Sequence, residues 1–307
     1  MFFVTRILQK ASTPKRFVEA YEALVPSVPF QHQIQRVIFQ TTKEKDKLSE
    51  PIRENIGRIR QCNPDWEYRL FDDSDIERYI LTHYGKAVLA FYHRIDEHYG
   101  AAKADFFRYL VVYREGGVYL DIKSTLDQPL SSVIREDDVY VLSYWNNLPG
   151  QGHEGFGHYP GLPDSIERGE IIQWYIAAAA GHPLLRRIII RMLYNIDHYN
   201  PYVNGVGWTG TVTTTGPVMY TTEIWNALNE HPDRFPVRWT DIIDTCGFRY
   251  SIFALQGENP ALPAHTAHLP SDYRKAVAPV IRHRNPVLNR VNQRYIKLLH
   301  RLHRTAL

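Results

Sequence analysis

Cysteine is scarce in this sequence, with only Cys62 and Cys246 among 307 residues. Two cysteines so far apart cannot form the framework of a disulfide-stabilised fold, so the composition does not call for an oxidising compartment. Long apolar runs are also absent, because Arg6 and Lys10 interrupt the apolar N-terminus well before the roughly 18 residues that a membrane span needs. We therefore expect a cytoplasmic protein.

Acidic residues are missing from residues 273–307, which contain nine Lys or Arg. The whole chain has 36 basic and 33 acidic residues and a net charge of +3, so the part before residue 273 has 27 basic residues and a net charge of −6. The excess positive charge is therefore confined to one end. No base-reading motif accompanies it, which argues against a nucleic-acid partner.

The basic end also has helical periodicity. After Pro286, apolar residues recur at alternating spacings of three and four, which predicts a basic amphipathic helix. These residues are Leu288, Val291, Tyr295, Leu298 and Leu302. Two interpretations remain open: a terminal helix packed on its own domain with solvated cations, or a helix that binds an anionic membrane surface, where each cation contributes about 1 kcal/mol.

The rest of the chain has the composition of a globular protein, with 44% hydrophobic and 22% charged residues. Strand-like segments alternate with helical ones, which predicts an α/β sheet covered by helices. We expect strands at residues 36–41, 67–71, 118–122 and 139–143, and helices at residues 51–61, 74–81, 86–99 and 101–115. We expect loops at the Pro- and Gly-rich residues 148–161 and at the Thr-rich residues 209–215, the second of which leads into a helix that Pro217 begins.

Residues 100–124 place several charged groups where a helix meets a strand. In the helix, spacings of three and four put four residues on neighbouring positions of one face, namely Ala102, Asp105, Arg108 and Tyr109. Gly116 and Gly117 then end the helix, because glycine adopts the left-handed conformation of helix ends. In the following strand, alternation puts Asp121 and Lys123 on the same face, about 6.5 Å apart along the strand.

This segment resembles the sugar-binding region of glycosyltransferase family 32, which includes the fungal initiation-type mannosyltransferases and many bacterial capsule and lipopolysaccharide enzymes. Its members usually have an A-x-[SA]-D-x-x-R helix followed by G-G-x-Y-x-D-x-D. Here residues 102–108 read AKADFFR and residues 116–123 read GGVYLDIK, so Lys123 replaces the second aspartate of the D-x-D motif. Weaker similarities follow the family's order, at RVIFQT (36–41), NPDWEY (63–68), LFDD (70–73), the stretch from II to GHP (171–183) and TGP (215–217).

The resemblance implies an α/β fold of the GT-A type, a Rossmann-like nucleotide-sugar-binding domain with added helices. We expect residues 34–272 to form this domain, residues 1–33 a helical extension, and residues 273–307 the basic helical segment. The resemblance also implies a retaining glycosyltransferase that moves a sugar from a UDP- or GDP-linked donor to a carbohydrate or lipid-linked glycan, in surface polysaccharide synthesis. Such a protein would be cytoplasmic or peripheral at the inner face of a membrane.

The same resemblance assigns roles to individual residues. Asp105 and Arg108 would hydrogen-bond the hydroxyls of the donor sugar, and Asp121 would contact the sugar and ribose and help to hold a metal ion. The predicted catalytic residues are Asp105, Arg108, Asp121 and Lys123. The predicted donor-binding residues are Phe39, Gln40, Asp72, Ala102, Asp105, Arg108, Tyr109, Gly117, Asp121 and His268, and the predicted acceptor-binding residues are Thr215 and Gly216.

Three of these residues also have structural explanations. Phe39 ends a strand, where an aromatic side chain is often part of the core. Asp72 precedes a helical segment and could cap its N-terminus. His268 could be an ordinary surface histidine.

The lysine at position 123 affects whether the site can bind a metal cofactor. In the family the second aspartate binds Mn²⁺ or Mg²⁺, which bridges the donor's two phosphates, whereas a protonated lysine cannot bind a metal. Lys123 could place its own charge against the diphosphate, or Asp121 and another carboxylate could still hold the divalent cation. It could also form only a structural ion pair with Asp121 or Asp127. The sequence leaves all three open.

Two other classes of protein fit the same residues. A glycoside hydrolase uses paired carboxylates, and Asp105 and Asp121 could take those roles. A non-catalytic protein that binds carbohydrate or nucleotide sugar would fit if Lys123 marks a lost metal site. Cleavage without a nucleotide sugar would indicate the first, and binding without turnover the second.

Overall fold

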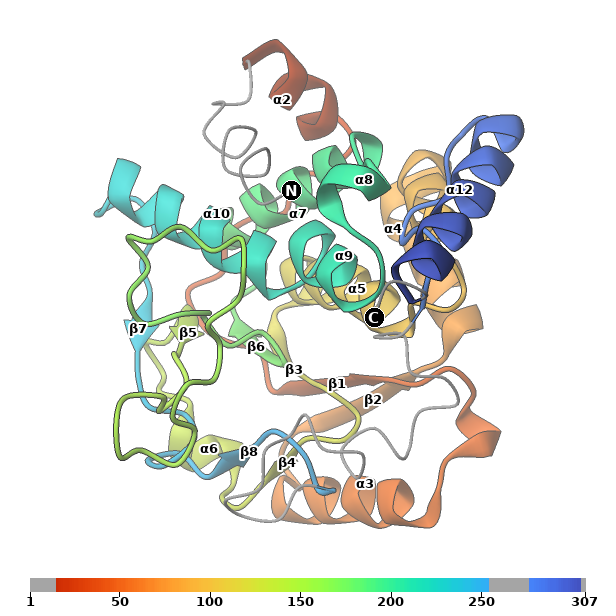
Figure 1. Cartoon of the computed structure of the whole chain (residues 1–307). Coiled ribbons are helices and arrows are strands. Elements are labelled where there is room, and N and C mark those ends of the chain that lie inside the picture. Colours follow the sequence, from red (N-terminus) through yellow and green to blue (C-terminus); the bar gives the residue numbers. More distant parts are fainter. Residues whose placement is uncertain (1–14, 254–275, 305–307) are drawn as a thin grey trace.

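The computed structural model describes residues 15–253 and 276–304 and is centred on a six-stranded mixed sheet in the order β2-β1-β3-β6-β5-β7 (Figure 1). The strands are β1 (Val37–Thr41), β2 (Glu67–Phe71), β3 (Gly117–Leu120), β5 (Tyr140–Leu142), β6 (Tyr175–Ala178) and β7 (Arg238–Trp239). Strands β4 (Thr125–Leu126) and β8 (Phe248–Arg249) form a separate antiparallel pair.

Parallel pairing places three strand ends at one edge of the sheet. Strand β1 pairs in parallel with both β2 and β3, whereas β6 runs antiparallel to β3 and β5. The carboxyl ends of β1, β2 and β3 therefore meet, and they deliver Gln40, Asp72 and Asp121 to the same edge. In open α/β sheets, ligands bind outside the carboxyl ends of the strands.

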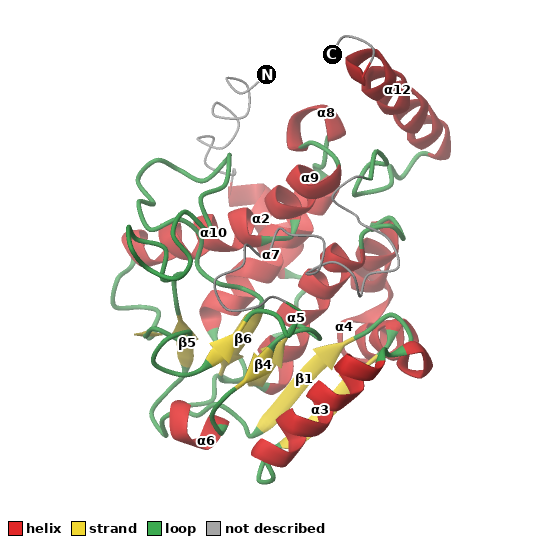
Figure 2. Cartoon of the chain, turned by 60° about the horizontal axis from the view of Figure 1, so that its bottom comes forward, coloured by secondary structure: helices red, strands yellow, loops and turns green. Residues whose placement is uncertain are grey.

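Helices cover both faces of the sheet. The helical segments are α2 (Lys15–Glu22), η1 (Lys45–Lys47), α3 (Glu50–Cys62), α4 (Asp73–Arg94), α5 (Gly100–Glu115), α6 (Leu130–Val133), α7 (Pro183–Asp197), α8 (Pro201–Asn204), α9 (Gly207–Thr214), α10 (Pro217–Glu230) and α12 (Pro286–Arg304). One apolar core joins α4, α5, α7 and α10 to the sheet, and a second packs α3, α6 and β8 against its other face. Figures 1 and 2 show α3 and α6 on the side of the sheet opposite α5 and α7. The predicted α/β sheet covered by helices is confirmed.

The two glycines after α5 have the predicted effect. Gly116 has a φ of 71° and Gly117 a φ of 107°, values that L-residues with side chains rarely adopt. A Cβ on Gly117 would lie 2.6 Å from both Cγ1 and the carbonyl oxygen of Val37 in β1. Glycine therefore allows the chain to reverse here and allows β3 to pack closely on β1.

Three local predictions were wrong in part. Strand β3 ends at Leu120 rather than beyond it, because residues 121–124 form a turn in which Ser124 N–H donates to the Asp121 carbonyl oxygen at 2.8 Å. The expected helices at 74–81 and 86–99 belong to α4, which is broken at Gly85 (φ 76°) and ends at Arg94.

The third concerns residues 209–215, which were expected to be a loop but mostly form α9. Their hydroxyls bond to carbonyls within the helix: Thr211 Oγ1 donates to Gly207 at 3.0 Å and Thr213 Oγ1 to Thr209 at 2.9 Å. These bonds satisfy the threonine hydroxyls, and the packing of the buried side of α9 outweighs the low helix propensity of threonine.

The basic helix predicted after Pro286 is confirmed as α12. Within residues 15–253 and 276–304, every helix is too short or too polar to cross a membrane. The division at residues 34 and 273 stays a prediction.

Candidate functional site

Helix α5 and the end of β3 bring three of the predicted site residues together. Asp105 and Arg108 lie one helical turn apart on α5, and Asp121 is the first residue after β3. Asp105 and Arg108 are each only 3% exposed. A buried charge is tolerated only when it is paired, so their partners define the site.

Arg108 holds both carboxylates. Its Nη2 lies 2.8 Å from Asp121 Oδ1 and 3.3 Å from Asp105 Oδ1, and its Nη1 donates to the Gln173 carbonyl oxygen at 2.6 Å. The guanidinium carbon lies 4.7 Å from the centre of the Tyr119 ring. Burial alone would lower the pKa of Arg108, but the neighbouring Asp121 and Asp105 raise it above its usual range. Arg108 is therefore a permanent cation that orients two carboxylates.

The Asp105 carboxylate has neutral partners as well. Thr215 Oγ1 donates to Asp105 Oδ2 at 2.9 Å, and Gln173 Nε2 donates to Oδ1 at 3.2 Å. Tyr109 supports both partners, since its hydroxyl lies 2.7 Å from Gln173 Oε1 and 2.9 Å from the Thr215 carbonyl oxygen. Burial raises the pKa of Asp105, and Arg108 opposes that rise. The structure thus brings the predicted acceptor residue Thr215 into contact with Asp105.

Asp121 and Lys123 are the accessible end of this cluster, with side chains 18% and 15% exposed. Lys123 Nζ lies 3.5 Å from Asp121 Oδ2 and 4.5 Å from the centre of the Tyr250 ring. Of the two carboxylates considered as ion-pair partners of Lys123, that of Asp121 therefore lies against it. The alternative pairing with Asp127 is not seen, because Asp127 Oδ2 lies 2.6 Å from Arg249.

These residues do not fit a divalent cation. Both oxygens of Asp121 face cations, Arg108 on one side and Lys123 on the other. In the described parts of the chain, no three His, Cys, Asp or Glu side chains lie close enough together to hold a metal ion. A divalent cation such as Mg²⁺ or Ca²⁺ prefers several oxygen ligands. Here the ammonium of Lys123 takes the place of the motif's second carboxylate.

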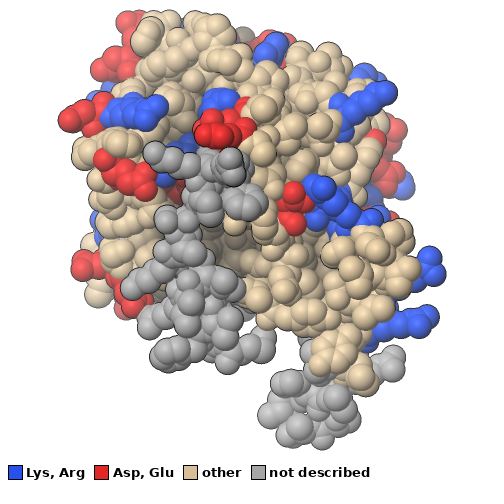
Figure 3. Space-filling model, turned by 90° about the horizontal axis from the view of Figure 1, so that it is seen from above, with Lys and Arg blue, Asp and Glu red and all other residues tan. Residues whose placement is uncertain are grey.

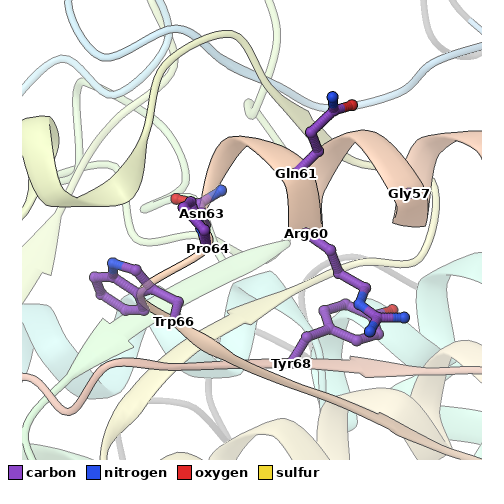
Figure 4. Close-up of a pocket in the computed structure, with 7 residues that line it drawn as sticks. All are labelled: Gly57, Arg60, Gln61, Asn63, Pro64, Trp66 and Tyr68. Carbon is purple, nitrogen blue, oxygen red and sulfur yellow. The ribbon is translucent and has the colours of Figure 1, made fainter.

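Gln40 joins the Asp121 turn to a neighbouring pocket. Its Nε2 donates to the Asp121 carbonyl oxygen at 3.0 Å, and its Oε1 accepts from the Tyr68 hydroxyl at 2.7 Å. Tyr68 lines a pocket of about 430 Å³ between the end of α3 and the start of β2, where the Arg60 guanidinium lies above the Tyr68 ring (Figure 4). The pocket is lined by Gly57, Arg60, Gln61, Asn63, Pro64, Trp66 and Tyr68.

The other predicted residues lie farther into the protein or serve local structure. Phe39 and Ala102 are fully buried in the core, and Gly117, the first residue of β3, is buried against β1. Asp72 caps α4, since its side chain accepts from Asp75 N–H. Direct contact of these residues with a donor stays a prediction.

Two predicted residues remain. Gly216 precedes α10 as its N-cap, and a Cβ there would lie 2.8 Å from Val212 Cα. His268 lies outside the described residues.

Sequence reasoning missed three members of the cluster. Gln173 contacts Asp105, Arg108 and Tyr109. It lies 65 residues beyond Arg108, within the stretch 171–183, and was not singled out there. Tyr119 lies under Arg108, and its place two residues before Asp121 on the same strand face was a usable signal. Tyr250, beside Lys123, had no sequence signal.

The sheet is that of an α/β protein, and the cluster lies at the carboxyl edge of its parallel strands. Residues 49–140 match the family model described as "Glycosyltransferase sugar-binding region containing DXD motif". This region runs from α3 to β5 and includes Asp105, Arg108, Asp121 and Lys123. The resemblance to the sugar-binding region of glycosyltransferase family 32 is thus confirmed over residues 49–140.

Individual relatives agree with this assignment. The chain is 27% identical over 238 residues to an initiation-specific alpha-1,6-mannosyltransferase of Schizosaccharomyces pombe, an alignment that covers 69% of this chain and 54% of the relative. It is 24% identical over 205 residues to the inositol phosphoceramide mannosyltransferase 3 of the same yeast, an alignment that covers 65% of this chain and 47% of the relative. The chain thus spans about half the length of these curated relatives.

A solved structure, the PaToxG glycosyltransferase, aligns with a TM-score of 0.45 at 16% identity over 71% of this chain and 77% of that chain.

Proposed function

We propose that this protein is a retaining glycosyltransferase that moves a sugar from a UDP- or GDP-linked donor to a carbohydrate or lipid-linked glycan, in surface polysaccharide synthesis. The observation that carries the proposal is the buried Arg108, which holds Asp105 and Asp121 together inside the matched sugar-binding region. The two relatives are named as mannosyltransferases, so mannose is the first sugar to test.

The cluster suits donor binding because one end is fixed and the other is accessible. Asp105 and Arg108 are almost fully buried and hold Asp121, whose partly exposed carboxylate keeps lone pairs that can accept hydrogen bonds from sugar hydroxyls beside its two cationic partners. In the transfer, the bond between the anomeric carbon and the phosphate oxygen breaks, and the nucleoside diphosphate leaves with the electron pair. The acceptor hydroxyl oxygen bonds to the anomeric carbon, and its proton passes to the leaving phosphate.

A donor screen tests this proposal. We expect the purified protein to hydrolyse one UDP- or GDP-sugar slowly without an acceptor and to transfer that sugar when a glycan acceptor is added, as measured by nucleoside diphosphate release. Cleavage of glycosides without any nucleotide sugar would indicate a glycoside hydrolase. Binding without release, for every donor with and without Mn²⁺, would indicate a non-catalytic binding protein.

We also propose that α12 binds the anionic inner face of a membrane, beside a lipid-linked acceptor. The orientation of the helix supports this. Among residues 286–298, whose burial the structure describes, the buried or half-buried side chains are mostly polar, namely Asn289, Asn292, Gln293 and Ile296. The Tyr202 hydroxyl lies 3.2 Å from Asn292 Oδ1. The apolar residues face outward instead: Leu288, Val291, Tyr295 and Leu298 are 46–52% exposed.

The charge on α12 favours a lipid surface over another partner. Arg290, Arg294 and Lys297 are exposed beside the apolar stripe, and the sequence from residue 273 onward has no acidic residue. In the view from above, basic side chains project from uncharged surface at the lower right, where α12 lies (Figure 3). An apolar stripe flanked by cations is typical of helices that lie in a membrane interface.

Vesicle sedimentation tests this contact. We expect the protein to sediment with phosphatidylcholine vesicles that contain phosphatidylglycerol, less so at high salt, and not with phosphatidylcholine alone. The V291S/L298S variant should lose the binding, whereas L81S, which changes an exposed leucine of α4, should retain it. Failure of the parent to bind anionic vesicles, or concentration-dependent dimerisation through α12, would contradict the proposal.

A further inference from the structure

The net charge of this site is two units more positive than that of a site with the D-x-D motif. Two units is the charge of a divalent metal ion. Asp105, Arg108, Asp121 and Lys123 together carry two negative and two positive charges. An aspartate at position 123 would leave this group at −2, which a divalent cation would neutralise. The replacement of aspartate by lysine raises the local charge by two units, and the group is neutral without a metal.

The protein holds the Lys123 ammonium in place from several sides. Asp121 Oδ2 and the Tyr250 ring both lie against Nζ. The Lys123 carbonyl oxygen accepts from Ile252 N–H at 2.9 Å, and the next residue, Ser124, donates its hydroxyl to the Tyr250 carbonyl oxygen at 2.9 Å. Asn55 Nδ2 also donates to the Ser124 carbonyl oxygen at 2.8 Å. Such a fixed cation meets developing negative charge without a cost of reorganisation.

We propose that Lys123 binds the diphosphate of the donor in place of a divalent cation, so that this protein binds nucleoside diphosphates and transfers sugar without a metal. The proposal rests on the proposed function. Lys123 stays protonated throughout and forms no covalent bond: it stabilises the negative charge that grows on the leaving phosphate oxygen as the bond to the anomeric carbon breaks. Asp121 keeps the ammonium at the carboxyl end of β3.

Titration calorimetry with UDP and GDP tests the proposal, in buffer with EDTA and in buffer with Mn²⁺. The parent should bind one of them with the same affinity in both buffers, within a factor of about two. The K123M variant should bind about 10- to 100-fold more weakly in both, the range expected for a lost charge-assisted hydrogen bond. The K123D variant, which restores the D-x-D motif, should bind only with Mn²⁺.

A second lysine provides a matched control. Lys103 Nζ also lies 3.5 Å from a carboxylate, that of Asp73, and 5.1 Å from a tyrosine ring, that of Tyr92, and its side chain is 18% exposed. The K103M variant should bind like the parent, and K123R should keep metal-independent binding. Thermal unfolding of each variant verifies its folding.

The outcomes separate the two proposals. Binding by the parent in Mn²⁺ but not in EDTA overturns the role of Lys123 and leaves the proposed function standing. No binding of UDP or GDP by the parent in either buffer overturns the proposed function and, with it, this inference.

Discussion

Burial shifts the pKa values of two side chains outside the cluster in opposite directions. Glu170 accepts hydrogen bonds from the Trp145 indole N–H and the Tyr159 hydroxyl, yet burial raises its pKa to about 7. His182 caps α7: its Nδ1 accepts from Leu184 N–H at 3.3 Å, so Nε2–H donates to the Pro236 carbonyl oxygen at 3.0 Å. Burial lowers the pKa of His182 to about 4. Both side chains are therefore neutral when folded near pH 6.

These two groups should oppose each other in the pH dependence of stability. From pH 4.5 to 7 the folded chain keeps the Glu170 proton that the unfolded chain loses, so stability falls as pH rises. From pH 6.5 down to 4 the unfolded chain protonates His182 and the folded chain does not, so stability falls as pH falls. Between 4.5 and 6.5 the two effects nearly cancel.

Single substitutions should reveal each effect. Relative to the parent, E170Q should gain stability as pH rises from about 5 to 6.5, by roughly 1 kcal/mol per pH unit, and H182N should lose stability over the same range at a similar slope. Urea unfolding of the three proteins at several pH values measures this. Curves that stay parallel to the parent's would show that these groups do not titrate as the structure requires.

The contacts of single residues were predictable from the sequence only where they are local. The spacing of Asp105 and Arg108 on one helix, and of Tyr119 and Asp121 beside one strand end, follows from helix and strand periodicity. Gln173 could not be found this way, because its contact with Arg108 depends on β6 pairing with β3. Long-range strand pairing is not encoded in any short segment.

Among the elements, the junction of α5 and β3 positions the whole cluster. The sequence predicted the helix, its end at Gly116 and the strand that follows, because glycine pairs and hydrophobic periodicity are strong local signals. It did not predict that β3 stops at Leu120, since the residues after it alternate as a strand would. The turn at residues 121–124 is instead held by long-range hydrogen bonds to Asn55, Tyr250 and Ile252. The low helix propensity of threonine predicted a loop where α9 lies, but packing in the folded protein outweighs that propensity.

Alanine substitutions at two separate glycines, Gly117 and Gly57, test the importance of this junction. Gly117→Ala should destabilise the protein by about 3 kcal/mol, because it combines an unfavourable positive φ with a Cβ placed against Val37. Gly57→Ala in α3 is the control: a Cβ there meets nothing within 4 Å, and alanine should stabilise the helix by about 0.5 to 1 kcal/mol. Chemical denaturation of both variants measures the difference. Equal effects would mean that β3 does not need the close approach to β1.

For the molecule as a whole, composition and alternation were sufficient to predict the α/β architecture with added helices. The fold then places the cluster at one edge of the sheet and α12 on the outside with its apolar residues exposed. The sequence left open whether that helix packs on its own domain, because periodicity identifies an apolar face but not what covers it. The central claim is that the cluster at the end of β3 is the donor site of a glycosyltransferase.

The most direct test of that claim is the donor screen carried out on the parent and on Asp121→Asn, in EDTA and at a temperature well below the unfolding midpoint of each. We predict nucleoside diphosphate release from one UDP- or GDP-sugar by the parent. We also predict a fall of about 100-fold or more in the variant, since Asp121 is the accessible carboxylate of the cluster. Equal rates for the two proteins, or no release by the parent from any nucleotide sugar with or without Mn²⁺, would contradict the claim.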